Sequence, residues 1–473
     1  MRGLYLLPFV LSSCVVGPDY VPPDVCFSDE WHAHAFQEGP LETWWEVFQD
    51  PLLDHYVALA VGNNPSLFAA ESHILQARAL KVVAASALFP QISADTNAQR
   101  LYFSKNGPLF AVPVGGGGIT PQMPRLQNLF NATLDATWEI DLFGKTQRAV
   151  EQAEDKIGFA IAQKDDVLVS ILAETARNYL EVRGLQARGR LVEKNISLLE
   201  EVAKVARARY EKGLTDRLDE ERVGAELATM KADLPLIISG IYQGIYALSV
   251  LVGLPPEALL SEMLPDAPLP AIVPNVGVGL RSDLLRRRPD VRMAERNLAQ
   301  ATAQVGIAVA SFFPTITLSG DIGYQSLFFN TLFQGASQTW AYGADVNLPI
   351  YSGGALVGNF NAAKWGANEA AWQYQMTLLA ALQDAESALV AYDQELKTHM
   401  LYHEAAERTS LVFSLSEKRY ASGLINLTDL LDSEREAVAA SLSETQSHTA
   451  VLLDVVRLYK ALGGGWESFQ RCP

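Results

Sequence analysis

Cysteine, histidine and basic residues are all scarce in this chain. Its 473 residues include three cysteines and seven histidines, and 37 basic residues face 54 acidic ones, for a formal net charge of −17. Three cysteines are too few for a disulfide framework at this length. Recognition of nucleic-acid phosphates needs clustered Lys and Arg, so the acidic balance argues against a nucleic-acid partner. No apolar run approaches the ~18 residues of a membrane-spanning helix.

Motifs for catalysis and metal binding are also lacking. There is no Gly-x-Ser-x-Gly, no Cys-x-x-Cys and no paired acidic motif outside helix faces. His399 and His403 are four residues apart and would share a helix face, but the Glu of a His-Glu-x-x-His motif is missing and no third ligand stands out nearby. We therefore expect a protein that is not an enzyme and has no cofactor and no metal site.

A secretion signal is present at the N-terminus. The stretch "LYLLPFVLSSC" is apolar, follows Arg2 and ends in small residues, so residues 1–13 are predicted to be a signal peptide. Leu-Ser-Ser-Cys has the form of a lipobox, which predicts that Cys14 carries the lipid of a bacterial lipoprotein. The alternative is a signal whose cysteine is incidental. Cys26 and Cys472 would either pair in an oxidising compartment or remain free thiols.

The chain repeats itself. "RYEKGL" begins at residue 209 and "RYASGL" at residue 419, and the segment "NPSLFAAES" from residue 64 aligns with "RPDVRMAER" from residue 288. Pro, Ala and Glu fall at matching places in the second pair without a gap. The chain is therefore predicted to be an internal tandem duplication, each half reading helix, strand, strand, long helix, tip, helix.

Four segments alternate apolar and polar residues with a period of two, at 91–103, 128–142, 314–326 and 339–351. Strands of this length with one apolar face are typical of a transmembrane β-barrel. A soluble sandwich is the alternative, but it would add further strands where long helical segments follow here. Four strands cannot close a barrel, since the smallest bacterial barrels have about eight. An open sheet edge in lipid leaves backbone groups unsatisfied, so several chains must assemble the pore.

Two Pro-free helical segments, 144–211 and 354–421, are each about 100 Å long if fully helical. Such helices must lie along others in a coiled-coil-like wall. Gly213 and Gly423 fit as C-terminal caps, and Asp216 and Asn426 fit as N-caps of the returning helices.

The predicted divisions of the chain follow from these patterns. They are a signal peptide (1–13), a lipid-anchored and equatorial segment (14–60), a first repeat (61–253; tip 213–217, returning helix 218–252), a linker (254–281), a second repeat (282–462; first helix 289–312, tip 423–427, returning helix 428–462) and a tail (463–473).

Six motifs together resemble one family. They are "CVVGPDY", "WWEVFQDPLLD", "GNNPSL", "WEIDLFGK", "LLRRRPDVRMAE" and the two Arg-Tyr-x-x-Gly-Leu tips. The chain resembles an outer-membrane efflux protein of the TolC type, most closely the OprM/NodT-like lipoprotein branch. The resemblance implies an α+β membrane protein: a homotrimer with a twelve-stranded β-barrel (four strands per chain) across the outer membrane, a twelve-helix α-barrel reaching into the periplasm, and a mixed equatorial belt.

The resemblance also implies function and partners. The protein would be the passive outer-membrane exit duct of a tripartite efflux pump for small molecules, working with a periplasmic adaptor protein and an inner-membrane transporter. The alternative is the outlet of a type I protein-secretion system. A trimeric surface adhesin is a third class, but it would place its strands together at the C-terminus and would not duplicate the unit.

Site residues carry over from the family by position. Cys14 would be lipidated, and the tips Gly213, Leu214, Gly423 and Leu424 would contact the adaptor. The closed periplasmic aperture would lie at Thr428 and Asp432, with Asp429 beside them. Independently of the family, Arg222 and Arg419 at the same hairpin ends are candidate charge partners in the same or the neighbouring subunit. Helix capping is the alternative for Asp429, and a solvated helix face is the alternative for Asp432. Relatives often have an apolar residue at the position of Thr428, which favours an acidic ring over an apolar plug.

Overall fold

The computed structural model describes residues 15–23, 31, 42–104, 124–273, 276–277 and 286–469. Cys14, Cys26 and Cys472 lie outside these residues, and so do the signal peptide and the loop 105–123. The chain divides into two compact units. The first holds residues 1–22, 75–157 and 296–371, and the second holds residues 23–74, 158–295 and 372–473.

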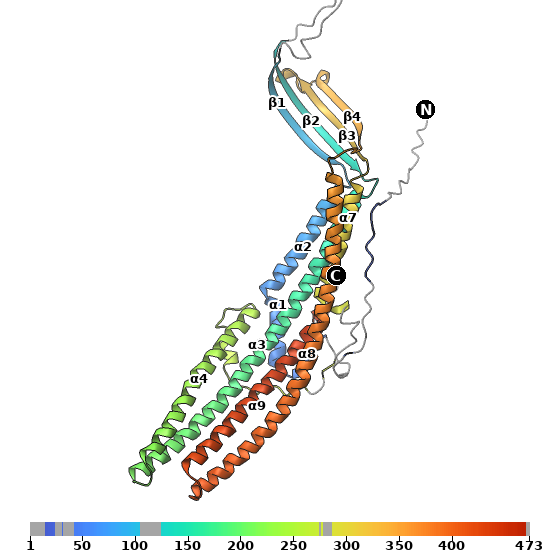
Figure 1. The fold of residues 1–473 in the computed structure, drawn as a ribbon. Helices are drawn as coiled ribbons and strands as arrows, with labels where there is room; N and C mark the ends of the chain where they lie inside the picture. The colour runs from blue at the N-terminus through green and yellow to red at the C-terminus, as the bar shows by residue number, and fades with distance from the viewer. Residues whose placement is uncertain are drawn as a thin grey trace, which may run out of the picture. The chain divides into compact units, whose positions relative to one another are not determined.

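Helices dominate the chain and four strands form one sheet (Figure 1). The first half contains η1 (Trp44–Phe48), α1 (Pro51–Asn63), α2 (Pro65–Ser86), β1 (Gln91–Tyr102), β2 (Leu126–Ile140), α3 (Lys145–Glu211), α4 (Arg217–Leu251) and α5 (Leu260–Met263). The second contains α7 (Pro289–Ala310), β3 (Thr315–Ser326), η2 (Phe329–Thr331), η3 (Gly335–Ser337), β4 (Gln338–Asn347), α8 (Ala355–Ala421), α9 (Leu427–Ala461) and η4 (Glu467–Phe469).

Corresponding helices of the two halves have equal lengths. α2 and α7 have 22 residues each, α3 and α8 have 67, and α4 and α9 have 35. The sequence did not indicate η1 and α1, which fall in the segment expected to be equatorial. α1 begins where the Asp50 side chain accepts hydrogen bonds from the backbone N–H groups of Leu52 and Leu53, with Pro51 at the first helical position.

The sheet of the first unit is antiparallel with the order β1-β2-β3-β4. Its register places apolar residues opposite one another in rows across the sheet, such as Leu134 between Ala94 and Ile322. The other face is polar, and Asp135 lies directly opposite Asp321. β4 ends at Asn347, although alternation continues to residue 351, because Pro349 has no N–H to donate to a ladder.

An N-terminal strap, Val15–Tyr20, lies in the same unit as the sheet. The N–H of Val16 donates to the carbonyl of Phe143 at 3.2 Å. Arg148 of α3 donates to the Val16 carbonyl at 3.3 Å and to Asp19 at 2.7 Å. A Cβ on Gly17 would stand 2.6 Å from the Cα of Gly306, so only glycine fits this crossing. The strap is thus fixed just beyond the end of β2.

The largest core lies in the second unit and includes α1 and parts of α3, α4, α8 and α9. Trp44 stacks on Tyr459 with ring centroids 5.4 Å apart, and the Tyr179 hydroxyl donates to Asp50 at 2.6 Å. These contacts bury η1 and α1 against the helices, which explains why this segment is ordered. Aromatic packing thus joins η1 to α9.

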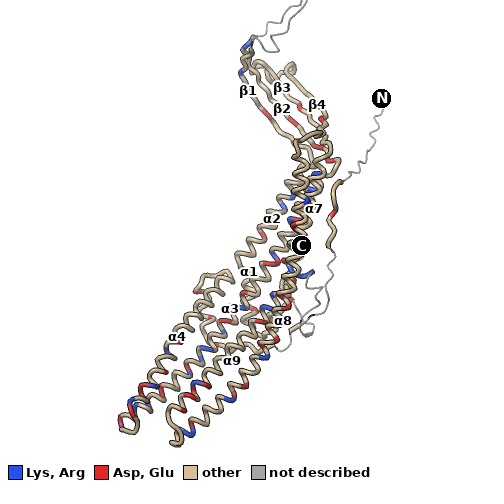
Figure 2. The backbone as a smooth tube through the Cα atoms, viewed as in Figure 1, with Lys and Arg blue, Asp and Glu red and all other residues tan. Residues whose placement is uncertain are grey.

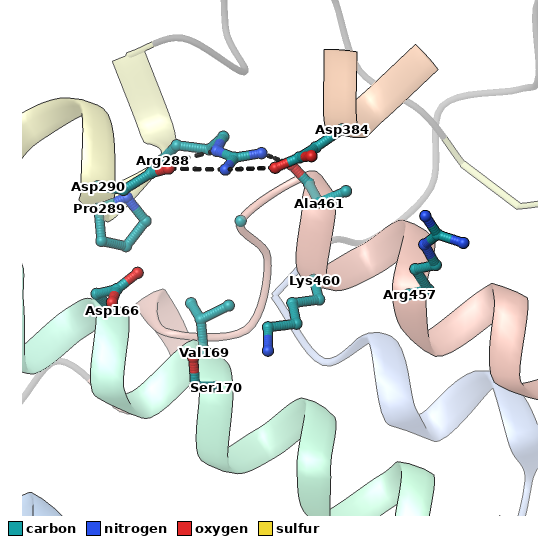
Figure 3. A pocket seen from close by; sticks show the side chains of 11 residues that line it. Asp166, Val169, Ser170, Arg288, Pro289, Asp290, Asp384, Arg457, Lys460 and Ala461 are labelled. Atoms are coloured by element: carbon teal, nitrogen blue, oxygen red, sulfur yellow. Dashed lines mark hydrogen bonds and ion pairs between the residues drawn. The ribbon is translucent and has the colours of Figure 1, made fainter. Parts of the chain in front are cut away.

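Arg288 connects three segments of this unit (Figure 3). Its guanidinium donates to the Ala461 carbonyl at 2.8 Å, at the C-terminal end of α9, and pairs with Asp290 at 2.7 Å and Asp384 at 3.5 Å. It borders a cavity of about 230 Å³ that Asp166 and Lys460 also line. Unpaired carbonyls at a helix end need donors, so this arginine has a structural role.

One expectation about apolar runs was wrong. Among the described residues, α4 contains a stretch apolar and long enough to cross a membrane, judged by length and composition only. Its apolar side chains are spread over exposed and buried positions: Ile237 and Ile245 are buried, whereas Leu236 and Val250 are exposed. A single helix of this kind is weak evidence for a span, because helices that pack in walls pass the same test.

Candidate functional site

The α3–α4 and α8–α9 turns close in the same way. Gly213 and Gly423 have φ angles of +70° and +73°. The N–H of Leu214 donates to the Arg209 carbonyl at 2.9 Å, and the N–H of Leu424 donates to the Arg419 carbonyl at 2.9 Å. These bonds define Schellman motifs, in which glycine takes the left-handed conformation. The expected C-caps are confirmed.

The predicted N-caps are also confirmed. The Asp216 side chain accepts a hydrogen bond from the N–H of Leu218, and the Asn426 side chain accepts one from the N–H of Asp429. The carboxylate of Asp429 is therefore not the cap itself. It lies exposed in the first turn of α9, where a negative charge is favourable.

Leu214 and Leu424 are the most exposed apolar residues of the turns, at 68% and 71%. Among the described residues, no heavy atom outside the turn lies within 4 Å of where a Cβ on Gly213 or Gly423 would stand. Each turn therefore presents a leucine beside an open glycine, as a surface that another protein can cover.

A small core holds the two hairpins together below these turns. It consists of Leu199, Ala206, Val223, Leu427, Leu430 and Leu431, all buried, with Tyr420 and Phe413 packed against them. Its residues come from α3, α4 and α9, so the two repeats share one apolar cluster at this end. The polar residues of the turns are positioned on that cluster.

Two arginines of the first hairpin donate hydrogen bonds to hydroxyl groups of the second. Arg209 donates to the Tyr420 hydroxyl at 2.7 Å, with its guanidinium 5.4 Å from the centre of the ring. Arg222 donates to the Thr428 hydroxyl at 2.6 Å. Within one chain, Arg222, a predicted charge partner of the aperture in the same or the neighbouring subunit, donates to the threonine hydroxyl.

Within one chain, the basic residue that lies beside Asp432 is Arg435. Arg435 lies 3.5 Å from Asp432 and 3.1 Å from Glu226 of α4. Among the described residues, Arg419 forms no ion pair with Asp429 or Asp432. The sequence comparison of the repeats missed Arg435 and Glu226, although the i,i+3 spacing of Asp432 and Arg435 on one helix was a usable signal.

The polar face of the sheet carries a second group of charges. Its carboxylates are Asp95, Asp135, Glu139, Asp321 and Asp345. The four strands contain a single basic residue, Arg100, which belongs to the opposite face, and Figure 2 shows acidic residues along the strands. Like charges directly opposite each other repel, so this face requires water or cations beside it.

The histidine pair has a third neighbour. The rings of His399 and His403 are 6.3 Å apart, and His448 of α9 lies 5.4 Å from His399. His403 interacts with Glu444 at 2.6 Å, and His448 with the Pro270 carbonyl at 2.9 Å. The sequence did not indicate that His448 lies beside this pair. Even so, no group of three or more ligating side chains in the described part of the chain has the geometry of a metal site.

Comparison with known proteins assigns the family. The sequence pattern of the family described as "Outer membrane efflux protein" matches residues 57–253 and 280–464, so the chain belongs to this family. It is 30% identical over 492 residues to the toluene efflux pump outer membrane protein TtgF of Pseudomonas putida, covering 100% of this chain and 99% of that protein. It is 28% identical to nodulation protein T of Rhizobium leguminosarum, covering 98% and 92% of the two chains.

Solved structures agree with this assignment. The outer-membrane channel OprN matches with a TM-score of 0.85 and 28% identity, covering 96% of this chain and 100% of that one. The chain therefore has the fold of TolC-type outer-membrane channels, and family members and structural neighbours are channels. It is the outer-membrane component of an efflux pump, through which cargo leaves.

Proposed function

We propose that three copies of this chain form one continuous duct that releases small molecules across the outer membrane. The observation that carries the proposal is the four-stranded sheet: among the described residues β1 pairs only with β2 and β4 only with β3, so both edge strands have unused hydrogen-bonding groups. Lipid offers no partners for such groups. Pairing β4 of one copy with β1 of the next removes the edges and gives a twelve-stranded barrel.

The two faces of the sheet support this assignment. Ile92, Trp340 and Tyr342 are exposed on the apolar face, which would contact lipid. The five carboxylates of the other face would line a water-filled lumen, where repulsion between Asp135 and Asp321 is relieved by solvent and cations. The lumen of the duct is then acidic, and its shape discriminates little between small molecules.

The equal helix lengths and the paired Schellman turns support an internal duplication, with repeats at 61–253 and 282–462. In a trimer the two hairpins of each chain would supply twelve long helices to a periplasmic α-barrel, and the segments at 14–60, 254–281 and 463–473 would form an equatorial belt. The turns at Gly213–Leu214 and Gly423–Leu424 would contact a periplasmic adaptor, which links the duct to an inner-membrane transporter.

The strap supports a lipid anchor. Cys14 is outside the described residues, but Val15 follows it directly, and Val15 lies against Gly144, four residues beyond the end of β2. A lipid on Cys14 would therefore start at the periplasmic edge of the membrane. One acyl chain adds little membrane affinity to a barrel that is already embedded in lipid. The anchor would therefore help to locate the protein in the outer membrane, but it would not replace the barrel.

The cargo we propose is a small toxic molecule, because the relative TtgF is named for toluene efflux. The test is complementation of a strain that lacks its own outer-membrane duct, with this chain and its neighbouring adaptor and transporter. Resistance to solvents or dyes should return. Export of a type I secreted protein without any gain of resistance would favour the alternative cargo.

Assembly is tested separately on purified protein in mild detergent. The particle should have about three times the 51.7 kDa mass of one chain, by light scattering corrected for detergent. A monodisperse monomer that still conducts ions in bilayers would contradict the barrel.

A further inference from the structure

A cavity of about 460 Å³ lies in the helical part of the second unit, between α3, α8 and α9. This volume is within the range of small-molecule sites. The lining of the cavity includes Lys194, Leu198, Phe413, Glu417, Glu434 and Val438.

Glu434 lines this cavity and is only 3% exposed. Its Oε1 atom is buried and has no hydrogen-bond partner among the described residues, while Asn195 of α3 hydrogen-bonds the carboxyl group. A buried carboxylate oxygen without a partner is costly, by about 1–3 kcal/mol or more for a charged group. A cationic donor in the cavity would remove that cost.

The charges around Glu434 come from all the helices packed on it. Burial raises the pKa of its carboxyl to about 7, and Glu226 of α4 adds to the rise, while Asn195 and Arg435 act in the opposite direction. Arg435 is already paired with Glu226 at 3.1 Å. The cavity is lined by three carboxylates, Glu201, Glu417 and Glu434, and by the ammonium of Lys194, and Glu201 is also paired with Lys204 at 2.7 Å.

The remaining wall is largely apolar. Leu191, Leu198, Ala437 and Val438 supply aliphatic surface, and the ring of Phe413 offers a face that attracts cations. An apolar body with a positively charged head matches this combination better than a hydrated metal ion, which would gain nothing from the aliphatic wall.

We propose that this cavity binds a small organic cation, with an ammonium or amidinium head on Glu434 and an apolar body along Leu198 and Phe413. The site occurs once in each chain, because the residue 210 positions earlier, the counterpart of Glu434 on α4, is Gly224. Binding at this cavity would be a function beyond conduction through the duct. The cavity lies among the helices, beside the apolar cluster of Leu199, Val223 and Leu430 that joins the two hairpins.

The test uses the purified full-length protein and two fluorescent probes of nearly the same shape. Near neutral pH 9-aminoacridine is positively charged and acridine is neutral. Fluorescence polarisation should detect binding of 9-aminoacridine, with acridine at least about tenfold weaker, as expected for loss of one charge-assisted hydrogen bond. Protonation of Glu434 competes with the cation, so the affinity should fall as the pH is lowered below about 7.

Three variants separate the site from adventitious binding. Glu434→Gln keeps a partner for Asn195 and removes the charge, and it should weaken 9-aminoacridine about tenfold or more. Glu436→Gln changes an exposed carboxylate two residues along that does not line the cavity, and it should leave the affinity unchanged. Val438→Trp should fill the cavity and remove binding of both probes.

Equal affinities of the wild type and Glu434→Gln, or equal affinities for the two probes, would overturn the proposal. Glu434→Gln removes a buried charge and should fold, which the thermal melting curve checks. Binding is measured without transport, so a failure here leaves the duct intact, and a failure of complementation leaves this site intact.

Discussion

The guanidinium of Arg222 on α4 donates a hydrogen bond of 2.6 Å to the hydroxyl of Thr428 on α9. The two residues belong to different repeats, and each lies in the first turns after a Schellman motif. The bond therefore joins the ends of the two hairpins within one chain. Sequence comparison placed both residues near the aperture but paired the arginine with carboxylates.

Removing the Thr428 hydroxyl should loosen this end of the duct. Thr428→Val is nearly isosteric and leaves Arg222 without its acceptor. The loss of about 1 kcal/mol corresponds to a roughly fivefold shift toward the open state. Single-channel recordings in planar bilayers should show more frequent openings, and cells should become more sensitive to large antibiotics. Thr428→Ser keeps the hydroxyl and should behave as the wild type; equal openings in all three proteins would exclude a locking role.

If Asp429 and Asp432 line the aperture, as we propose, they should make the resting pore selective for cations. Asp429 is exposed, and Asp432 is partly neutralised by Arg435 at 3.5 Å, so Asp429→Asn should reduce selectivity more than Asp432→Asn. Asp429→Ala with Asp432→Ala should raise conductance and abolish block by trivalent cations added from the periplasmic side. If the double variant keeps the wild-type conductance, ion selectivity and cation block, neither residue lines the aperture. Both would then lie on a solvated helix face.

The glycine of the second turn should be needed for adaptor contact. Gly423 has a φ of +73°, which asparagine tolerates and bulky residues do not, and nothing nearby obstructs a side chain. Gly423→Trp should therefore abolish efflux, while Gly423→Asn should retain most of it. Trimer level is measured for both by blotting. Full efflux with Gly423→Trp at normal trimer level would remove this turn from the adaptor interface.

Stability should depend on pH through Glu434. Its folded pKa of about 7 lies above the ordinary value of 4.5, so the folded state holds a proton that the unfolded state releases. The stability from this group is fully present below about pH 4.5 and is lost as the pH rises through 7. Glu434→Gln should therefore stabilise the protein at pH 8, by at most about 3 kcal/mol, and hardly at pH 4.5. If the difference in melting temperature between the wild type and Glu434→Gln does not change with pH, the titration of Glu434 is not its cause.

Lipidation should depend on Cys14 alone. Cys14→Ser should abolish incorporation of labelled palmitate and leave the trimer in the outer membrane, because the barrel holds it there. Cys26→Ser is the matched control and should be labelled like the wild type. Label that persists in Cys14→Ser would refute the lipobox.

The sequence predicted the strands and long helices closely, because alternation and the two glycine turns are local signals. The helix expected over 144–211 is Lys145–Glu211, and the strand expected over 91–103 is Gln91–Tyr102. α1 was missed because its burial depends on Tyr179 and other residues more than a hundred positions away. The end of β4 was missed because alternation continues past the residue where pairing stops.

The site was harder to predict than the fold. The repeat in the sequence identified the turns. The surroundings of four other residues depend on how the helices pack against one another; these are Arg435, Glu226, His448 and Glu434. Glu434 is polar in sequence and would be taken for a surface residue. Its burial follows only from the way α9 lies on α3, which no local pattern contains.

The open edges of the sheet have a genetic consequence. Among the described residues, the outer edges of β1 and β4 have no partner strand in their own chain, so in the proposed trimer each subunit depends on the edge strands of both neighbours. A copy with a proline in the middle of β1 would still be made and would still occupy places in trimers. When normal and altered copies are equally abundant and mix at random, only roughly one trimer in eight would be wholly normal. Such an allele would be dominant over the wild type, whereas a simple deletion would be recessive.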